Sequence, residues 1–449
     1  MLNFIFKYFV YYPVTLIRSE YFYFYLKWLN KTQYLSPDKL AEMQKRKLEK
    51  LVSYSAKNVP HYKFLKNIEL TSDGFENKFS DIPFVTKEVL RHESERLISK
   101  TVKANKCATK TSGGSTGAPV TILKHHKGVG EELAAAWRGY KWAGVDVGEK
   151  QARFWGVPLN AAGQKRADWI DFVCHRKRVS AFSFDQESLS NAVSMLERFK
   201  PEYFYGYVSV IRQFTDFYVS QNNSPLSIKP KCIITTSETL DDQNRELFSS
   251  IYDCRVFNEY GCGEVGTIAH ECEQGSLHIN SENILLEIVD GNGHCLPNGS
   301  DGEIVVTDLN NFAMPLIRYK LKDFGRISTS VCQCGRGLPV LEKVYGRAYD
   351  IIVNSDGKKF HGEFFLYIFE DIKKELGILI DGLQITQTDI NKLEIKMVTS
   401  IDNLNKISSK IVDVLHEKFD STVRVSFKLV NQIERESSGK LRVIKGLAQ

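Results

Sequence analysis

Segments with helical spacing of apolar residues alternate with short apolar runs over the first half of the chain. Three segments carry apolar side chains three and four residues apart with charges between them, which predicts helices. They are residues 38–57, 187–199 and 207–220. Three short runs, rich in β-branched or aromatic residues, predict buried strands at residues 152–157, 231–237 and 254–261. This alternation of helices and strands indicates an α/β fold with a largely parallel sheet.

The pattern changes after about residue 280. Residues 283–290, 302–309 and 316–327 alternate apolar and polar positions, as half-exposed strands do, and Gly- and Asn-rich turns lie between the first two. We therefore expect a smaller β-rich subdomain over about residues 270–345.

A third pattern follows Gly346. Residues 347–449 predict a compact α+β domain. Its expected elements are a strand (350–354), a helix (362–376), two strands (383–389 and 392–398), a second helix (401–419) and a further strand (423–430). We place a domain boundary near residues 346–350, so that residues 36–346 form a large N-terminal domain. Residues 1–35 are a separate segment rich in aromatic side chains.

This N-terminal segment has two interpretations. Lys7, Pro13, Arg18 and Glu20 interrupt its apolar residues, so no run reaches the roughly 18 residues that a membrane-spanning helix needs. No small-residue cleavage site follows a short apolar core, as it would in a signal peptide. The segment is expected either to pack as a helix on the large domain or to rest on a membrane surface through its Tyr, Phe and Lys side chains.

Composition narrows the class of protein. The chain has 449 residues, of which 43% are hydrophobic and 25% charged, as in a globular protein of two or three domains. Its net charge of +6 is spread along the chain, without the concentrated basic patch of a nucleic-acid-binding protein. The nine cysteines are irregularly spaced, which indicates a reducing cytosol. We expect a cytoplasmic protein, or one held peripherally on the inner face of the membrane.

Residues 111–120, TSGGSTGAPV, are the first candidate for chemistry. Consecutive Gly, Ser and Thr residues let backbone N–H groups converge on one point, and the hydroxyls add donors, which is how an uncharged loop holds phosphate. The stretch is not a Walker A loop, because the chain has no Gly-Lys-Ser/Thr sequence. The alternative is a flexible linker.

The loop resembles the phosphate-binding loop of the adenylate-forming superfamily, which includes acyl-CoA ligases, luciferases and nonribosomal peptide adenylation domains. The matching residues are Thr111, Ser112, Gly113, Gly114, Ser115, Thr116 and Gly117. Ala118 stands where many relatives have Lys. The resemblance implies a large α/β domain with a β-rich subdomain, followed by a small mobile α+β lid domain over residues 347–449.

Further motifs follow in the family's order and extend the resemblance to residue 442. NEYGCGE (258–264) resembles Y-G-x-x-E, TTSETL (235–240) an adenine-contacting turn, and IRYKLKDFG (317–325) the motif Y-R-x-G-D. Leu321 departs from that last pattern. GRAYD (346–350) resembles the interdomain hinge, and ESSGKLRV (436–443) the terminal lysine loop, although the usual upstream Pro is missing.

These motifs imply roles for individual residues. Tyr260 would stack near adenine, Asp323 would bind the ribose hydroxyls, and Arg347 would face the nucleotide. Further nucleotide contacts are expected from Ser237, Glu238, Glu259 and Gly261. The implied catalytic residues are Glu264, which helps hold Mg²⁺, Thr116 on the phosphates, and Lys440, which contacts the carboxylate and phosphate during adenylation.

Within the superfamily the chain resembles the phenylacetate–CoA ligase-like branch, which includes proteins linked to capsule and exopolysaccharide synthesis. Residues 270–279, 314–323 and 332–339 carry this resemblance. Some relatives hold a structural Zn²⁺ at four positions that match Cys272, His278, Cys332 and Cys334. Three thiolates and an imidazole are a normal tetrahedral zinc set. The alternative is that these are buried free cysteines.

The resemblance implies an ATP-dependent carboxylate ligase. The acid would attack the α-phosphate of ATP to give an acyl-adenylate, and a second nucleophile would displace AMP. Coenzyme A is the expected acceptor, with an amine on a sugar or amino acid as the alternative. A fold that has lost turnover and serves as a scaffold is the remaining possibility. The acid is expected near Trp155, Tyr205, Gly206 and Tyr207, although such aromatic residues also form cores. The sequence leaves the oligomeric state open.

Overall fold

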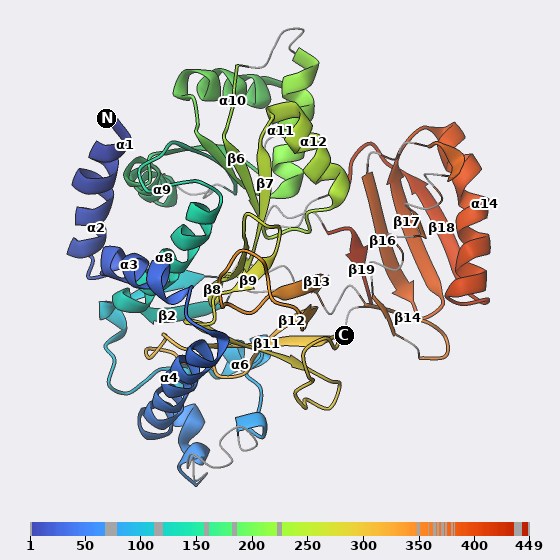
Figure 1. Ribbon diagram of the computed structural model, residues 1–449. Coiled ribbons are helices and arrows are strands. Elements are labelled where there is room, and N and C mark those ends of the chain that lie inside the picture. The colour runs from blue at the N-terminus through green and yellow to red at the C-terminus, as the bar shows by residue number, and fades with distance from the viewer. Residues whose placement is uncertain are drawn as a thin grey trace. The chain divides into compact units, whose positions relative to one another are not determined.

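The computed structural model forms two compact units (Figure 1). It describes residues 2–447 apart from 68–78, 112–119, 157–160, 182–185, 222–226, 348–350, 358, 362–364, 366–367, 370–371, 373–374, 379, 381 and 435–441. The first unit consists of Met1–Lys320 and Arg326–Lys343. The second consists of Leu321–Gly325 and Val344–Gln449.

A seven-stranded sheet organises the first unit, in the order β4-β3-β5-β6-β7-β8-β9. Its strands are β3 (Gln151–Trp155), β4 (Arg176–Ser180), β5 (Tyr203–Gly206), β6 (Cys232–Thr236), β7 (Arg255–Cys262), β8 (Gly266–Glu271) and β9 (Leu277–Ile279). The strands from β4 to β7 are parallel, and β8 and β9 add an antiparallel edge. The three strands predicted in this region and the parallel sheet are confirmed.

Helices cover both faces of this sheet (Figure 1). The first group is α10 (Gln186–Phe199), α11 (Val208–Gln221) and α12 (Asp242–Tyr252), and the second is α8 (His126–Trp142) and α9 (Ala161–Val173). One apolar core lies under the first group around Phe154, Phe204 and Phe214. A second core around Trp137 and Tyr140 lies on the side of α8 and the N-terminal helices. The helices predicted at 187–199 and 207–220 are confirmed as α10 and α11.

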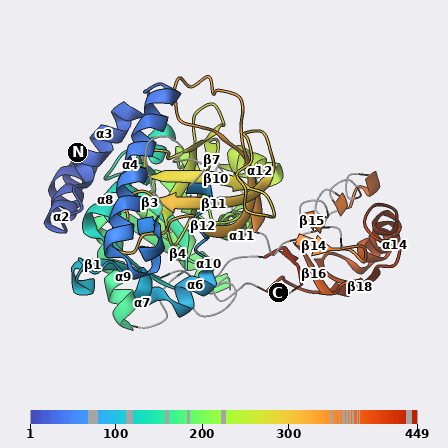
Figure 2. The same ribbon diagram turned by 90° about the horizontal axis from the view of Figure 1, so that it is seen from below.

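The N-terminal segment is helical and packs on the rest of the first unit (Figure 2). It comprises α1 (Leu2–Ile5), the π-helix η1 (Phe6–Tyr11), α2 (Tyr12–Ile17) and α3 (Phe22–Thr32), and the predicted helix α4 (Pro37–Asn58) follows it. Phe22, Leu26 and Leu29 are buried against α8, and the indole of Trp137 donates a 2.8 Å hydrogen bond to the hydroxyl of Tyr11. Among the described residues, no helix has the length and apolar character needed to cross a membrane.

Smaller elements complete the first unit. They are η2 (Pro60–Asn67), α6 (Lys87–His92), α7 (Ser94–Leu97), η3 (Ala104–Lys106) and the hairpin of β1 (Cys107–Thr111) and β2 (Thr121–His125). A four-stranded sheet follows in the order β10-β11-β12-β13: β10 (Ile284–Val289), β11 (Gly302–Asp308), β12 (Tyr319–Ile327) and β13 (Leu341–Arg347). Its first three strands are the predicted ones. Leu321–Gly325 of β12 and the end of β13 from Val344 are assigned to the second unit.

The second unit has its own sheet, in the order β18-β17-β16-β19, and its own core. The elements are β14 (Ile351–Val353), β15 (Lys359–His361), β16 (Gly382–Asp389), β17 (Lys392–Val398), α14 (Ile401–Lys418), β18 (Arg424–Leu429) and β19 (Ile444–Lys445). Ile407, Ile411 and Leu415 of α14 are buried against the sheet, which accounts for the apolar spacing of that helix. The predicted strands and the second predicted helix occur in the expected order, and the first predicted helix lies largely outside the described residues.

Candidate functional site

The carboxyl ends of the parallel strands meet at one edge of the large sheet, which is where ligands bind in open α/β sheets. Most of the described residues that the sequence assigns to a nucleotide or an acid lie at these strand ends or directly after them. Trp155 ends β3, Gly206 ends β5, Ser237 follows β6, and Glu259 to Gly261 lie near the end of β7. The parallel register therefore brings together residues that are far apart in the sequence.

The predicted phosphate loop connects the two strands of a hairpin. β1 and β2 pair antiparallel from Cys107 opposite His125 to Thr111 opposite Thr121. Ser112, Gly113, Gly114, Ser115, Thr116 and Gly117 lie outside the described residues. Their phosphate contacts, and that of the Thr111 side chain, stay predictions.

Glu132 of α8 ties the base of this hairpin to the turn after β7. Its carboxylate accepts a 2.6 Å hydrogen bond from Lys110 of β1 and a 3.1 Å bond from Lys124 of β2. Burial alone would raise the pKa of Glu132, but these two lysines hold it below its ordinary value. A Cβ atom added to Gly266 would lie 2.3 Å from the Cδ atom of Glu132, so the turn approaches the carboxylate as closely as a glycine allows.

Glu264 lies buried in that same turn. The hydroxyl of Tyr319 donates a 3.1 Å hydrogen bond to its Oε1, and the ammonium of Lys87 lies 3.5 Å from the same atom. Burial works to raise the pKa of Glu264, but Lys87 and the hydrogen bonds hold it below its ordinary value, so the carboxylate is ionised at neutral pH. An ionised, buried carboxylate is a suitable single protein ligand for Mg²⁺ that is also bound by substrate phosphates.

The backbone positions Lys87 beside this carboxylate. Val85 pairs with β12 through hydrogen bonds to the backbone of Arg318 and Lys320, and the Thr86 side chain caps α6. Lys87 is the first residue of α6 and therefore lies next to Tyr319 and Glu264.

The structure describes four further residues that the sequence predicts to contact the nucleotide, and each has a different environment in the fold. Tyr260 is half-buried on β7, and Gly261 has no room for a side chain, because a Cβ atom there would lie 2.5 Å from the carbonyl oxygen of Gly266. Ser237 has a left-handed backbone with a φ of 68°. Glu238 accepts hydrogen bonds from the amide (2.7 Å) and hydroxyl (2.8 Å) of Ser209, and so caps the first turn of α11.

The predicted ribose and lid residues belong to the second unit. Asp323 lies partly exposed on β12, and Arg347 is the last residue of β13. Lys440 lies outside the described residues, as does the side chain of Arg347. Lys322, directly before Asp323, has a φ of 62°, a conformation that favours glycine. When Tyr319 and Asp323 are aligned with the pattern Y-R-x-G-D, Gly falls at Lys322, Arg at Lys320 and the unrestricted position at Leu321. The departures are therefore Lys320 and Lys322, and not Leu321.

The predicted acid-binding residues form a cluster of aromatic rings. The ring of Trp155 lies 4.3 Å from that of Tyr207 and 5.9 Å from that of Tyr205, centroid to centroid. Gly206 lets β5 approach β3, since a Cβ atom there would lie 2.1 Å from the carbonyl oxygen of Phe154. The cluster borders both cores, so its rings also stabilise the fold.

A guanidinium group lies on these rings. The Cζ atom of Arg153, on β3, is 4.6 Å from the centre of the Trp155 ring and 4.8 Å from the centre of the Tyr205 ring. Within the described part of the chain, no carboxylate lies within ion-pair distance of Arg153. Its neighbours Arg176 and Arg178 on β4 both pair with Asp171, at 2.5 and 2.9 Å. Arg153 is therefore the arginine of this sheet face that keeps its charge available.

Glu259 lies next to this cluster. The hydroxyl of Tyr205 donates a 3.0 Å hydrogen bond to its Oε1, and its Oε2 has no hydrogen-bond partner among the described residues. Burial raises the pKa of Glu259 to about 7, which the Tyr205 hydrogen bond and the Arg153 charge only partly offset. A carboxyl group that holds its proton near neutrality can donate a hydrogen bond as well as accept one.

The four candidate zinc ligands come together. The potential ligand atoms of Cys272, His278, Cys332 and Cys334 all lie within 4.8 Å of one another. The two sulfurs of Cys272 and Cys332 are 3.7 Å apart, and the Cys334 sulfur is 3.2 Å from Nε2 of His278. Ligands at ordinary zinc distances would lie roughly 3.5–3.8 Å apart, so the set fits a tetrahedral Zn²⁺. Nδ1 of His278 lies 3.0 Å from the carbonyl oxygen of Leu338, which orients Nε2 toward the sulfurs.

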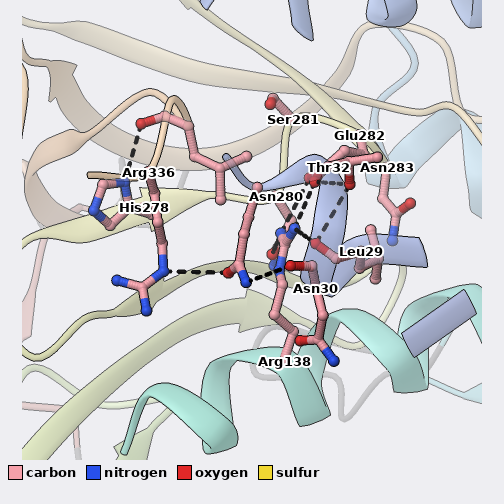
Figure 3. A network of polar contacts seen from close by, with 12 residues as sticks. Leu29, Asn30, Thr32, Arg138, His278, Asn280, Ser281, Glu282, Asn283 and Arg336 are labelled. Atoms are coloured by element: carbon pink, nitrogen blue, oxygen red, sulfur yellow. Dashed lines mark hydrogen bonds and ion pairs between the residues drawn. The ribbon is translucent and has the colours of Figure 1, made fainter. Parts of the chain in front are cut away.

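A buried polar network links this cluster to the N-terminal helices (Figure 3). Arg336 donates a 3.2 Å hydrogen bond to the side chain of Gln33, at the end of α3. Deeper in the network, Arg138 of α8 pairs with Glu282 at 2.5 Å, and both side chains are fully buried. Arg138 also donates to Asn280 at 2.7 Å, and Thr32 donates to Glu282 at 2.8 Å. These contacts hold α3, α8 and the segment after β9 together.

Sequence reasoning missed several residues of these arrangements. Lys87, Glu132 and Arg153 carry no motif, and only their neighbours in the fold give them a role. For Arg153 one signal was present: a basic residue in the middle of an otherwise apolar strand, ARFW, is unusual unless its charge is used. No comparable signal marks Lys87 or Glu132.

Comparison with known proteins identifies relatives over nearly the whole chain. Protein CapK of Staphylococcus aureus is 25% identical over 418 residues, which cover 90% of this chain and 88% of that protein. A phenylacetate-coenzyme A ligase of Thermus thermophilus is 22% identical, and the match covers 92% of this chain and 98% of that protein. Residues 352–446 match the family model of the CapK C-terminal domain.

Solved structures share the fold. The crystal structure of a 2-hydroxyisobutyryl-CoA ligase in the postadenylation state, in complex with R3-HIB-AMP, has a TM-score of 0.69 at 17% identity. The match covers 91% of this chain and 88% of that one. The crystal structure of an anthranilate CoA ligase in complex with anthranoyl-AMP has a TM-score of 0.52 at 16% identity. This match covers 76% of this chain and 66% of that one. The α/β fold that the sequence predicted is therefore confirmed.

Proposed function

We propose that this chain is an ATP-dependent carboxylate ligase. The proposal follows from its homology to Protein CapK and to phenylacetate-coenzyme A ligases. A carboxylate oxygen attacks the α-phosphorus of ATP, the bond to the β-phosphate bridging oxygen breaks, and pyrophosphate leaves. A nucleophile then attacks the acyl carbon and displaces AMP. Both steps concentrate negative charge, so the protein must supply cations and hydrogen-bond donors where that charge develops.

The homology over nearly the whole chain is the observation that carries this proposal, and the contacts of Glu132 support it. Glu132 accepts hydrogen bonds from both strands of the hairpin that bears the predicted phosphate loop, and it packs against Gly266, next to the turn that bears Glu264. The loop's backbone N–H groups and hydroxyls, in particular those of Ser115 and Thr116, would hold the β- and γ-phosphates. Tyr260 would stack near adenine, with further contacts from Ser237, Asp323 and Arg347. Lys440 would contact the reacting carboxylate and α-phosphate during adenylation and leave when the lid domain rotates.

Glu264 would hold a Mg²⁺ ion that also binds the phosphates, and this ion would neutralise part of their charge. In the arrangement described, Lys87 occupies one side of that carboxylate. We infer that Lys87, which balances part of the charge of Glu264, would also lie near the phosphates that such a Mg²⁺ ion would bind. This gives an otherwise unassigned lysine a role in the site.

The cluster of Trp155, Tyr205 and Tyr207 would bind the acid, as the sequence suggested. Arg153 on these rings, with its charge unpaired among the described residues, favours an acid that carries a second anionic or hydrogen-bonding group. Glu259 would add a hydrogen bond to a hydroxyl or carbonyl group of the same substrate. A purely hydrocarbon acid would leave Arg153 without an anionic partner and Oε2 of Glu259 without a hydrogen bond, which is costly for groups inside the protein.

Coenzyme A is the acceptor that the phenylacetate-coenzyme A ligase relatives favour, which would make the product a thioester. An amine acceptor, which would give an amide, is the second candidate that the sequence leaves open. Either product would suit a role in surface polysaccharide synthesis. Cys272, His278, Cys332 and Cys334 would hold a structural Zn²⁺ that joins the large sheet to the loop after β12 and takes no part in the chemistry.

Carboxylate-dependent exchange between ATP and pyrophosphate tests the adenylation step. A panel of aromatic, hydroxy, dicarboxylic, amino and uronic acids would be compared for the wild type, Glu264→Gln and Lys440→Ala. Lys428→Ala, an exposed lysine of the same unit paired with Glu394, is the matched control. We expect exchange with one acid class, loss of at least about 100-fold in the two site variants, and no change in the control.

The outcome separates the alternatives. Mass spectrometry of the product with coenzyme A or an amine present distinguishes a thioester from an amide. A protein that binds ATP, as a raised melting temperature would show, yet gives no exchange with any acid would support the scaffold alternative. Metal analysis of the wild type, Cys332→Ser and the control Cys254→Ser tests the zinc site: we expect one zinc per chain, lost only in the first variant.

A further inference from the structure

The outer side of the N-terminal segment is a surface of exposed aromatic rings. Phe4, Phe9 and Phe24 are 58%, 70% and 61% exposed. Tyr8 and Tyr23 lie between them, at 43% and 42%. Folded proteins rarely leave large apolar side chains so exposed in one place unless that surface binds something.

The rings touch one another and form a continuous surface. Centroid distances connect Phe9 to Phe4 (6.4 Å), Phe4 to Tyr8 (4.6 Å) and Tyr8 to Tyr12 (5.4 Å). Tyr12 lies 5.2 Å from Tyr23, whose ring lies 5.6 Å from Phe24. We call this set of six rings the aromatic surface.

Helix α9 adds two more exposed rings beside η1. Phe6 of η1 contacts Phe172 at 5.8 Å, and Phe172 contacts Trp169 at 5.9 Å. Trp169 and Phe172 are 60% and 54% exposed. The aromatic surface itself comes from α1, η1, α2 and α3, and this segment is held on the rest of the first unit by Tyr11, Phe22 and Leu26.

The charges around the aromatic surface identify its partner. In residues 2–34 the only carboxylate is Glu20, which is buried and paired with Arg18 at 2.8 Å. Lys27 and Lys31 of α3 and Lys165 and Arg166 of α9 are exposed, and Asp168 is the exposed acid of α9. Exposed cations beside Phe, Tyr and Trp rings are the composition of helices that lie in the interface of an anionic bilayer.

We propose that the aromatic surface binds the protein to the surface of an anionic lipid bilayer. The short helices lie flat at the level of the headgroups, with their rings among the first acyl carbons and their cations on the anionic headgroups. The site for the acid and nucleotide then works next to the membrane. This inference does not depend on the proposed ligase activity.

Flotation of the full-length protein with lipid vesicles tests this proposal. Vesicles of phosphatidylcholine alone are compared with equimolar phosphatidylcholine and phosphatidylglycerol. The test variant is Phe4→Ser/Phe9→Ser/Phe24→Ser. The matched control, Val331→Ser/Ile401→Ser/Leu429→Ser, removes three side chains that are 78%, 55% and 45% exposed elsewhere. Thermal melting of both variants checks that they are folded.

We expect the wild type and the control to float with the anionic vesicles, and the test variant to bind at least about tenfold less. Lys27→Gln/Lys31→Gln should reduce the preference for phosphatidylglycerol, and added salt should weaken binding. Equal flotation of test variant and control, or no flotation of the wild type, would overturn the proposal. So would light scattering that shows a stable oligomer which the test variant dissociates, because the partner would then be a second copy of the chain.

Discussion

Two arginines on the same side of the large sheet show how differently a charge inside the fold can be used. Arg138 pairs with Glu282 at 2.5 Å, Asn280 and Thr32 add hydrogen bonds to the pair, and the Nε of Arg138 has no hydrogen-bond partner among the described residues. Arg153 lies on the rings of Trp155 and Tyr205, and none of the described carboxylates is within ion-pair distance of it. The charge of Arg138 is neutralised by the fold itself, whereas Arg153 keeps its charge for a group that the fold does not supply.

The same contrast holds for the carboxyl groups that accompany the two arginines. Glu282 has a guanidinium and a hydroxyl as partners, and so it stabilises the fold. Glu259 receives one hydrogen bond from Tyr205, and burial raises its pKa to about 7. A protein tolerates an incompletely satisfied buried group where a ligand will complete it. The comparison thus separates structural from functional polar groups without any motif.

Breaking the ion pair between Arg138 and Glu282 should have the largest effect on stability. Arg138→Met leaves Glu282 buried without its cation, which should lower the free energy of unfolding by about 3–5 kcal/mol, measured by denaturant titration. The double variant Arg138→Met/Glu282→Leu removes both charges and should recover most of that loss. A single variant within about 1 kcal/mol of the wild type would show that the pair does not hold the fold.

The pH dependence of stability tests Glu259. Its folded pKa of about 7 lies above the ordinary value of 4.5, so between these pH values the folded protein keeps a proton that the unfolded chain has released. The stability of the wild type relative to Glu259→Gln should therefore fall as pH rises from 4.5 to about 7, by at most about 3 kcal/mol, and stay constant above. A difference between the two proteins that does not change over this range would contradict an elevated pKa.

Arg153 should affect binding of the acid more than stability. Arg153→Met is expected to raise the KM for the acid about tenfold in the exchange assay, the effect of one lost charged contact, with little change in melting temperature. Arg178→Met is the matched control, because Arg178 lies opposite Arg153 on β4 but is held by Asp171. The control should lose stability and keep its KM. The reverse result would make Arg153 a structural residue.

The smallest effect is expected at Lys322. Its left-handed backbone strains any residue that has a Cβ atom, so Lys322→Gly should be about 1 kcal/mol more stable than Lys322→Ala. At Lys396, within β17 and outside the set of residues with positive φ, Gly should instead be less stable than Ala. Denaturant titration of the four variants measures both differences. If Gly were the less stable residue at position 322, the strain would not be present in solution.

The sequence predicted elements well where one face is buried and the other is solvated. α10, α14, β16 and β17 show this alternation and were placed within a residue or two. β4, with the sequence RKRVS, was missed because two of its basic residues are balanced only by Asp171 of another element. α8 was missed because Gly130 and Gly139 lie where its backbone approaches Glu20 and His270 most closely, which interrupts the apolar pattern.

For the candidate site, the sequence indicated residues in motifs but not the contacts between them. It predicted the four Cys and His residues that the structure brings together. It also assigned Glu238 to the nucleotide, and the structure places that side chain on Ser209 at the start of α11. The roles of Lys87, Glu132 and Arg153 depend on tertiary contacts between elements that are far apart in the sequence. No residue spacing in the sequence predicts such contacts.

The contacts of α3 also set the order in which the chain can fold. Gln33 bonds to Arg336, which is 303 residues away, and Thr32 bonds to Glu282, which is 250 residues away. The N-terminal helices therefore leave the ribosome long before their partners exist, and contacts at such separation form late. During synthesis an aromatic segment without its partners is open to aggregation or to capture by a chaperone. The residues made first are among the last to reach their final places.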